Sequence, residues 1–126
     1  MARFLVVDDD PVVRHILGAI IESLGHELIA FSEGEPALEF LINAKAQGNP
    51  PVLAFLDFQL AEMTGIELLL RIRAIFDSAA LPVAMLSANS REEVFVADAS
   101  AAPDHFVSKP FTLDDIQQLL SSTGLG

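Results

Sequence analysis

The amino-acid sequence predicts an α/β fold: a doubly wound, five-stranded parallel sheet with helices on both faces. Short, unbroken apolar runs, typical of strands buried on both faces, alternate with segments whose apolar residues recur at helical spacing. The alternation repeats five times without a break in composition. Successive βα units favour a parallel sheet with right-handed crossovers, and the strand order 2-1-3-4-5 is the natural candidate.

The strands are expected where apolar runs are bounded by turn residues. The first run is followed directly by three aspartates, and the cluster of Gly48, Asn49 and two prolines marks the turn before the third. The five expected strands are residues 4–7, 27–31, 52–56, 82–86 and 105–107.

A helix is expected after each strand. Asp10 followed by Pro11 supplies an N-cap and a first helical residue, and Gly25 ends the helix that begins there. Capping-box spacing recurs further along the chain. The remaining helices are expected after Ser32 and Glu35 up to about residue 46, over residues 65–76, from Ser90 with Glu93, and from Thr112 with Asp115.

The length of 126 residues and the 52% hydrophobic content fit one domain, residues 1–126. Because cysteine is absent, disulfides, thiolate metal sites and cysteine nucleophiles are excluded. Eighteen acidic residues against seven basic ones give a formal net charge of −11, which disfavours binding to nucleic acid or anionic membranes. With no signal peptide and no apolar run near the ~20 residues of a spanning helix, a cytoplasmic location is expected.

Five polar side chains fall on one edge of the predicted sheet. Asp8 and Asp9 follow the first strand, Asp57 ends the third, Ser87 ends the fourth, and Lys109 lies just past the fifth. Doubly wound sheets bind their ligands at this edge. Converging carboxylates repel one another unless a cation is present, and Mg²⁺ suits one or two carboxylates with a phosphate. The set indicates a carboxylate nucleophile, a metal, and two groups for phosphoryl oxygens.

Four segments in this order give the chain a family resemblance. They are residues 6–10, residues 56–57 with 63–65 behind them, residues 85–88 and residues 107–111. From end to end the chain resembles the CheY-like receiver domains of two-component response regulators. The resemblance implies a flavodoxin-like fold and a phosphoacceptor switch, not a turnover enzyme, with self-phosphorylation and self-dephosphorylation chemistry only. It also implies a histidine kinase or phosphotransfer protein as phosphodonor.

The resemblance assigns a role to each site residue. Asp57 corresponds to the phosphoacceptor, and Asp8 and Asp9 to the acidic pair that holds Mg²⁺ or Mn²⁺, with Asp9 as the direct ligand. The remaining positions are the backbone carbonyl of Gln59 as a further metal ligand, Ser87 and Lys109 for the phosphoryl oxygens, Phe106 as the switch aromatic, and a cis Lys109–Pro110 bond.

The resemblance also implies how the domain signals. The output surface is the face formed by the fourth helix, the fifth strand and the fifth helix, with dimerisation on phosphorylation as one mode of response. No output domain follows the last helix, so a stand-alone regulator acting by protein contact or phosphorelay is expected. The chain departs from the family pattern at Ala61, where proline is usual, and at Thr64, where aspartate is usual. Both bear on the rigidity of the loop after Asp57.

Two alternatives remain open from the residues. A haloacid-dehalogenase-type phosphohydrolase would use Asp8 as nucleophile and Asp10 as acid, but it would leave Asp57 without a role. A receiver-like interaction module without phosphorylation would not need the acidic pair, the acceptor, the hydroxyl and the lysine together. Turnover of simple phosphate esters would distinguish the enzyme from a switch.

Overall fold

The computed structural model describes residues 2–88 and 102–125, and its centre is one parallel sheet with the strand order β2-β1-β3-β4-β5. This order and the parallel pairing confirm the predicted fold class. The strands are β1 (Arg3–Val7), β2 (Glu27–Phe31), β3 (Leu53–Asp57), β4 (Val83–Ser87) and β5 (His105–Ser108).

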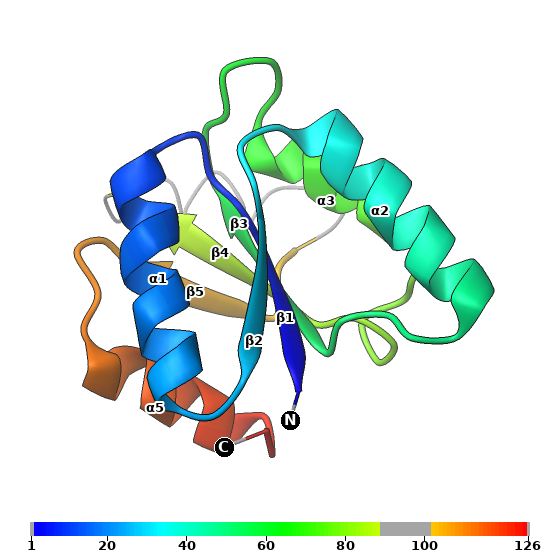
Figure 1. The fold of residues 1–126 in the computed structure, drawn as a ribbon. Helices are drawn as coiled ribbons and strands as arrows, with labels where there is room; N and C mark the ends of the chain where they lie inside the picture. Colours follow the sequence, from blue (N-terminus) through cyan, green and yellow to red (C-terminus); the bar gives the residue numbers. More distant parts are fainter. Residues whose placement is uncertain (1, 89–101, 126) are drawn as a thin grey trace.

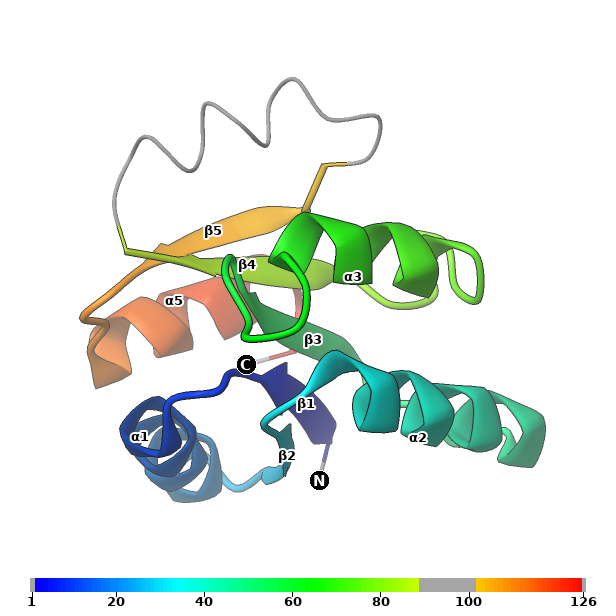
Figure 2. The same cartoon turned by 90° about the horizontal axis from the view of Figure 1, so that it is seen from above.

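Helices cover both faces of the sheet. The helices α1 and α5 lie on one face and α2 and α3 on the other (Figures 1 and 2). Their bounds are α1 (Pro11–Ser23), α2 (Gly34–Gln47), α3 (Gly65–Arg73) and α5 (Leu113–Ser122). The short helix expected from Ser90 and Glu93 lies outside the described residues. Among the helices that the structure describes, none has the length and apolar character needed to cross a bilayer.

The predicted caps of α1 and α5 are confirmed. Asp10 Oδ1 accepts a hydrogen bond from the Val12 amide at 2.9 Å, with Pro11 as the first helical residue. At α5, Thr112 and Asp115 form a reciprocal capping box, in which each side chain accepts from the other residue's amide. These local bonds satisfy amides that the first helical turn leaves without partners.

Two helix boundaries differ from the sequence-based expectation. The helix α2 begins at Gly34 with Glu33 at the N-cap, so Ser32 is not its cap, and the Glu33 side chain makes no capping bond. The helix α3 ends at Arg73 rather than at residue 76. The chain tightens there, because the Ile75 amide donates to the Ile72 carbonyl, three residues back instead of four.

The sheet separates two buried apolar clusters. Alternate side chains of β1 and β3 enter opposite clusters: Leu5 and Leu56 pack with α2 and α3, whereas Phe4 and Phe55 pack with α1 and α5. Because both faces are covered, these strands are apolar throughout, and their burial supplies the main stabilisation of the fold. A polar residue directly after such a strand therefore emerges at the edge of the sheet.

Candidate functional site

The strand register brings Asp8 and Asp57 to the same place. Val7 of β1 pairs with Leu56 of β3, so the next residues of the two strands are Asp8 and Asp57. Side chains two residues apart on a strand point to the same side of the sheet, so Asp57 points as Phe55 does, toward the side covered by α1 and α5. Asp8, which lies beside Asp57, points to the same side. The adjacency predicted from the strand order is thus present in the structure.

Lys109 joins the two carboxylates. Its Nζ lies 2.9 Å from Asp8 Oδ2 and 3.0 Å from Asp57 Oδ1. The Lys109 amide donates to the Ser87 carbonyl at 2.8 Å, and the Lys109–Pro110 peptide bond is cis, as expected. The end of β5 is thereby fixed against β4, with the ammonium group between the acids.

Asp8 is the most buried of the three acids, with no exposed surface. Its Oδ1 accepts from the Asp10 amide at 2.9 Å, and its backbone carbonyl accepts from Arg14 Nη1 at 2.6 Å. Its other oxygen, Oδ2, lies 2.9 Å from Lys109 Nζ. The ammonium group therefore offsets the charge of this buried carboxylate.

The three acids fit a hard divalent cation. Asp8, Asp9 and Asp57 each offer a carboxylate oxygen, and these oxygens all lie within 4.8 Å of one another. Asp8 is buried and Asp9 is exposed, so the cluster is open to solvent on one side. Oxygen ligands without soft partners favour Mg²⁺, Mn²⁺ or Ca²⁺ over the softer transition metals.

The environment shifts the pKa of both charged partners. Burial, followed by the charges of Asp8 and Asp9, raises the pKa of Asp57 above its ordinary value, although Lys109 opposes the shift. Burial lowers the pKa of Lys109, but its contacts with Asp8 and Asp57 outweigh this effect and raise it overall. Lys109 is therefore held in its charged form between the acids.

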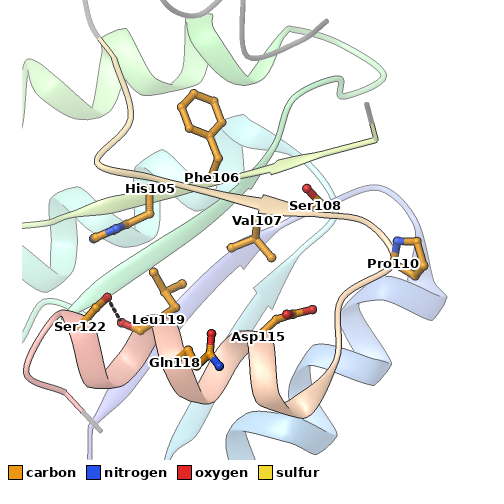
Figure 3. Close-up of a pocket in the computed structure, with 9 residues that line it drawn as sticks. All are labelled: His105, Phe106, Val107, Ser108, Pro110, Asp115, Gln118, Leu119 and Ser122. Atoms are coloured by element: carbon orange, nitrogen blue, oxygen red, sulfur yellow. Dashed lines mark hydrogen bonds between the residues drawn. The ribbon is translucent and has the colours of Figure 1, made fainter. Parts of the chain in front are cut away.

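The other predicted site residues lie around this cluster. Ser87 ends β4 and is buried, with its neighbour Leu86 paired to Asp57. Gln59 is exposed, two residues past Asp57, where it forms an isolated bridge with Thr64. Phe106 lies on β5 with 39% of its surface exposed, and its ring points away from α5 (Figure 3).

Comparison with known proteins assigns the family. The family model of the response regulator receiver domain matches residues 4–121. The chain belongs to this family. Its acidic pocket of Asp8, Asp9 and Asp57 with Lys109 is therefore that of a receiver domain, a phosphoacceptor module rather than a conventional enzyme.

Solved receivers share the architecture across nearly the whole chain. A CheY-like response regulator receiver domain protein from Methanospirillum hungatei is 25% identical with a TM-score of 0.80, covering 98% of this chain and 93% of that one. The response regulator TrrA from Thermotoga maritima, solved in complex with Mg²⁺-BeF, is 28% identical with a TM-score of 0.78, covering 97% and 98%.

Curated relatives are longer than this chain. The two-component response regulator ORR1 of Oryza sativa subsp. japonica is 30% identical over 125 residues, which cover 94% of this receiver and 54% of that protein. The chain spans about half the length of the first curated relatives that it matches.

The family assignment removes the phosphohydrolase alternative, and the receiver's own contacts agree with it. That alternative needed Asp10 as a free acid, but the Asp10 carboxylate is bonded to the Val12 amide as a helix cap. Asp8, its proposed nucleophile, is buried against Lys109.

Sequence reasoning missed three residues that shape the receiver's site. Arg14 holds the Asp8 carbonyl, Glu62 reaches the start of α2, and Thr64 caps α3 by accepting from the Glu67 amide at 3.1 Å. Thr64 and Glu67 have the capping-box spacing, so that cap could have been predicted. The aspartate-to-threonine departure thus leaves α3 with a side-chain cap of its own. Arg14 bonds to a carbonyl six residues earlier and Glu62 to an amide 28 residues earlier, and neither spacing is a capping or turn pattern.

Proposed function

We propose that this receiver domain accepts a phosphoryl group on Asp57 from a histidine kinase or phosphotransfer protein and works as a phosphorylation switch. The observation that supports this most strongly is the position of Asp57, whose Oδ1 lies 3.0 Å from Lys109 within the cluster formed with Asp8 and Asp9. The Lys109 ammonium, a compact point charge beside Asp57, lies where it can contact the oxygens of a phosphoryl group on that carboxylate.

In the proposed transfer, a carboxylate oxygen of Asp57 attacks the phosphorus of a phosphohistidine donor. The new bond joins that oxygen to phosphorus, and the phosphorus–nitrogen bond breaks with its electron pair going to the imidazole. Lys109 and the Ser87 hydroxyl contact the phosphoryl oxygens. Little covalent work is needed beyond positioning and charge neutralisation.

Mg²⁺, or Mn²⁺ in its place, fits the donor set. Asp9 and Asp57 would bind it directly, Asp8 would act largely through water, and the Gln59 carbonyl would complete the protein ligands. When bound, the ion supplies positive charge that offsets the carboxylates and the phosphoryl group. The three carboxylate oxygens of Asp8, Asp9 and Asp57, which all lie within 4.8 Å of one another, support this assignment.

The proposed response passes from Ser87 to Phe106. The Ser87 hydroxyl moves toward the phosphoryl oxygens, and the Phe106 ring turns inward into the space released. Phe106 lacks the hydroxyl of tyrosine, so burying it leaves no polar group without a partner, and an inward rotamer is expected to coexist with the exposed one before phosphorylation. The output face includes the groove of about 510 Å³ between β5 and α5, where Val107 and Leu119 point toward each other (Figure 3).

The decisive experiment follows the mass of the protein after incubation with a small phosphodonor and Mg²⁺. The parent should gain one phosphoryl group, and Asp57→Asn should gain none. Asp10→Asn is the matched control, because asparagine caps a helix as well as aspartate does and Asp10 is the neighbouring acid outside the proposed role. Full phosphorylation of Asp57→Asn would show that the acceptor is another residue.

A further inference from the structure

The loop that leaves the phosphoacceptor strand is closed by its own backbone bonds. The Gly65 amide donates to the Phe58 carbonyl at 2.6 Å, and the Leu60 amide donates to the Met63 carbonyl at 3.0 Å. Gln59 and Thr64 form the bridge between these bonds. Residues 58–64, called the β3–α3 loop below, therefore form a compact turn whose tip extends beyond the sheet edge.

The tip of this loop supplies the cap that α2 lacks. The Glu33 side chain makes no capping bond, and instead Glu62 Oε1 accepts from the Gly34 amide at 2.6 Å, from 28 residues away. A carboxylate at a helix N-terminus makes a charge-assisted bond and interacts favourably with the helix dipole. The start of α2 and the tip of the β3–α3 loop are thereby joined.

A second contact lies beside the first. Met63 packs so closely against Gly34 that a Cβ at this glycine would lie 2.8 Å from the Met63 sulfur. The ion pair between Arg71 of α3 and Glu35 of α2 joins two exposed side chains outside the loop and so contributes little. Glu62 and Met63 therefore determine where the loop tip sits relative to α2.

From these contacts we propose that Glu62 is a positioning residue, which fastens the β3–α3 loop to α2 and so holds the backbone at Gln59 in place for the metal. The inference rests on the proposed function for its metal readout. The loop begins directly after Asp57, and Gln59 is three residues before Glu62, so freeing the tip moves the segment that contains the carbonyl ligand. Ala61, beside Glu62, adds no proline ring that would stiffen the turn.

The first test compares Mg²⁺ dissociation constants, measured by NMR titration, for the full chain and three variants. Glu62→Ala should bind Mg²⁺ about 10-fold more weakly, the lower end of the loss found for residues that orient metal ligands. Glu62→Gln keeps an oxygen acceptor and should stay within about 2-fold of the parent. Glu39→Ala removes the same charge from an exposed position of α2 and should also stay within about 2-fold, which controls for long-range charge effects.

A rescue variant separates positioning from helix capping. In Glu33→Asp combined with Glu62→Ala, aspartate gives α2 an N-cap of its own, so thermal stability should return toward that of the parent. Mg²⁺ binding should stay weak. In the metal-free protein, the loop amides of Leu60 and Gly65 should still exchange with solvent faster than in the parent.

The inference is overturned if Glu62→Ala keeps the parent's loop exchange and Mg²⁺ affinity, or if the rescue variant recovers both. The loop exchange needs no metal, so it decides the role of Glu62 even if the parent fails to bind Mg²⁺. Failure of the parent to bind Mg²⁺ would count against the proposed function instead. Binding and phosphorylation by the parent, with Glu62→Ala matching it in every measurement, would refute only the role of Glu62.

Discussion

Gly65 begins helix α3 and lies against the end of strand β3, and its replacement by alanine should be strongly destabilising. A Cβ at this position would lie 2.3 Å from the Asp57 carbonyl oxygen, 2.9 Å from the Met85 sulfur and 3.0 Å from the Phe58 Cα. Two of these three neighbours are backbone atoms, which cannot rotate away. Overpacking usually costs 1–3 kcal/mol, and rigid neighbours place Gly65→Ala near the upper end, at about 3 kcal/mol.

Gly18→Ala is the matched control. Gly18 lies inside α1, and its nearest non-helical neighbour is the Leu28 Cδ2 atom, 3.7 Å from an added Cβ, an ordinary contact. Alanine there should stabilise the helix by up to about 1 kcal/mol. The two variants make the same chemical change in opposite surroundings, so their free energies of unfolding should differ by about 4 kcal/mol.

Urea unfolding followed by far-ultraviolet circular dichroism measures this difference, because the chain has no tryptophan or tyrosine for fluorescence. If the free energy of unfolding of Gly65→Ala lies within about 1 kcal/mol of the parent's, the close approach of α3 to Asp57 is not a constraint on the fold. The loop would then have room to shift without cost, and the geometric argument would be refuted.

Three further predictions concern the site. Asp9→Ala should weaken Mg²⁺ binding at least about 10-fold in a metal titration, yet be no less stable without metal, because it removes a like charge from the cluster; unchanged affinity would place the ion elsewhere. Asp57→Asn should be more stable than the parent at about pH 7 without metal, because burial and the charges of Asp8 and Asp9 raise the pKa of Asp57 above 3.8. That gain should vanish at about pH 3, where Asp57 is protonated in both folded and unfolded states, and an equal gain at both pH values, measured by urea unfolding, would contradict this cause. Ser87→Ala should blunt the NMR response of Phe106 to a phosphoryl mimic; a response equal to the parent's, with Phe106 wholly outward before the mimic is added, would show that the two are not coupled.

The position of the site could be predicted because it depends on strand order and strand ends alone. Asp57 and Lys109 are 52 residues apart, yet both follow apolar runs whose ends must meet at one sheet edge. The caps of α1 and α5 were equally accessible, since each is a bond between residues two or three positions apart. Local patterns therefore gave the strands, most helix starts and the acidic cluster.

What could not be predicted are bonds between a side chain and the backbone of another element. Glu62 in a loop and Gly34 at a helix start have no pattern that connects them, and neither do Arg14 and the Asp8 carbonyl. The start of α2 at Gly34 was not located for the same reason: the bond that caps it comes from Glu62, 28 residues along the chain. Such bonds depend on how helices pack on the sheet, which periodicity does not specify.

Lys109 has a consequence for the ion that the site can accept. Three carboxylates and one ammonium leave the cluster with an excess of two negative charges, which a single divalent cation neutralises. A monovalent ion would leave the cluster negative, and a trivalent lanthanide would make it positive. Without the lysine the excess would be three, and the balance would shift toward the trivalent ion. The lysine, which is not itself a ligand, thus sets the valence of the ion that makes the cluster neutral.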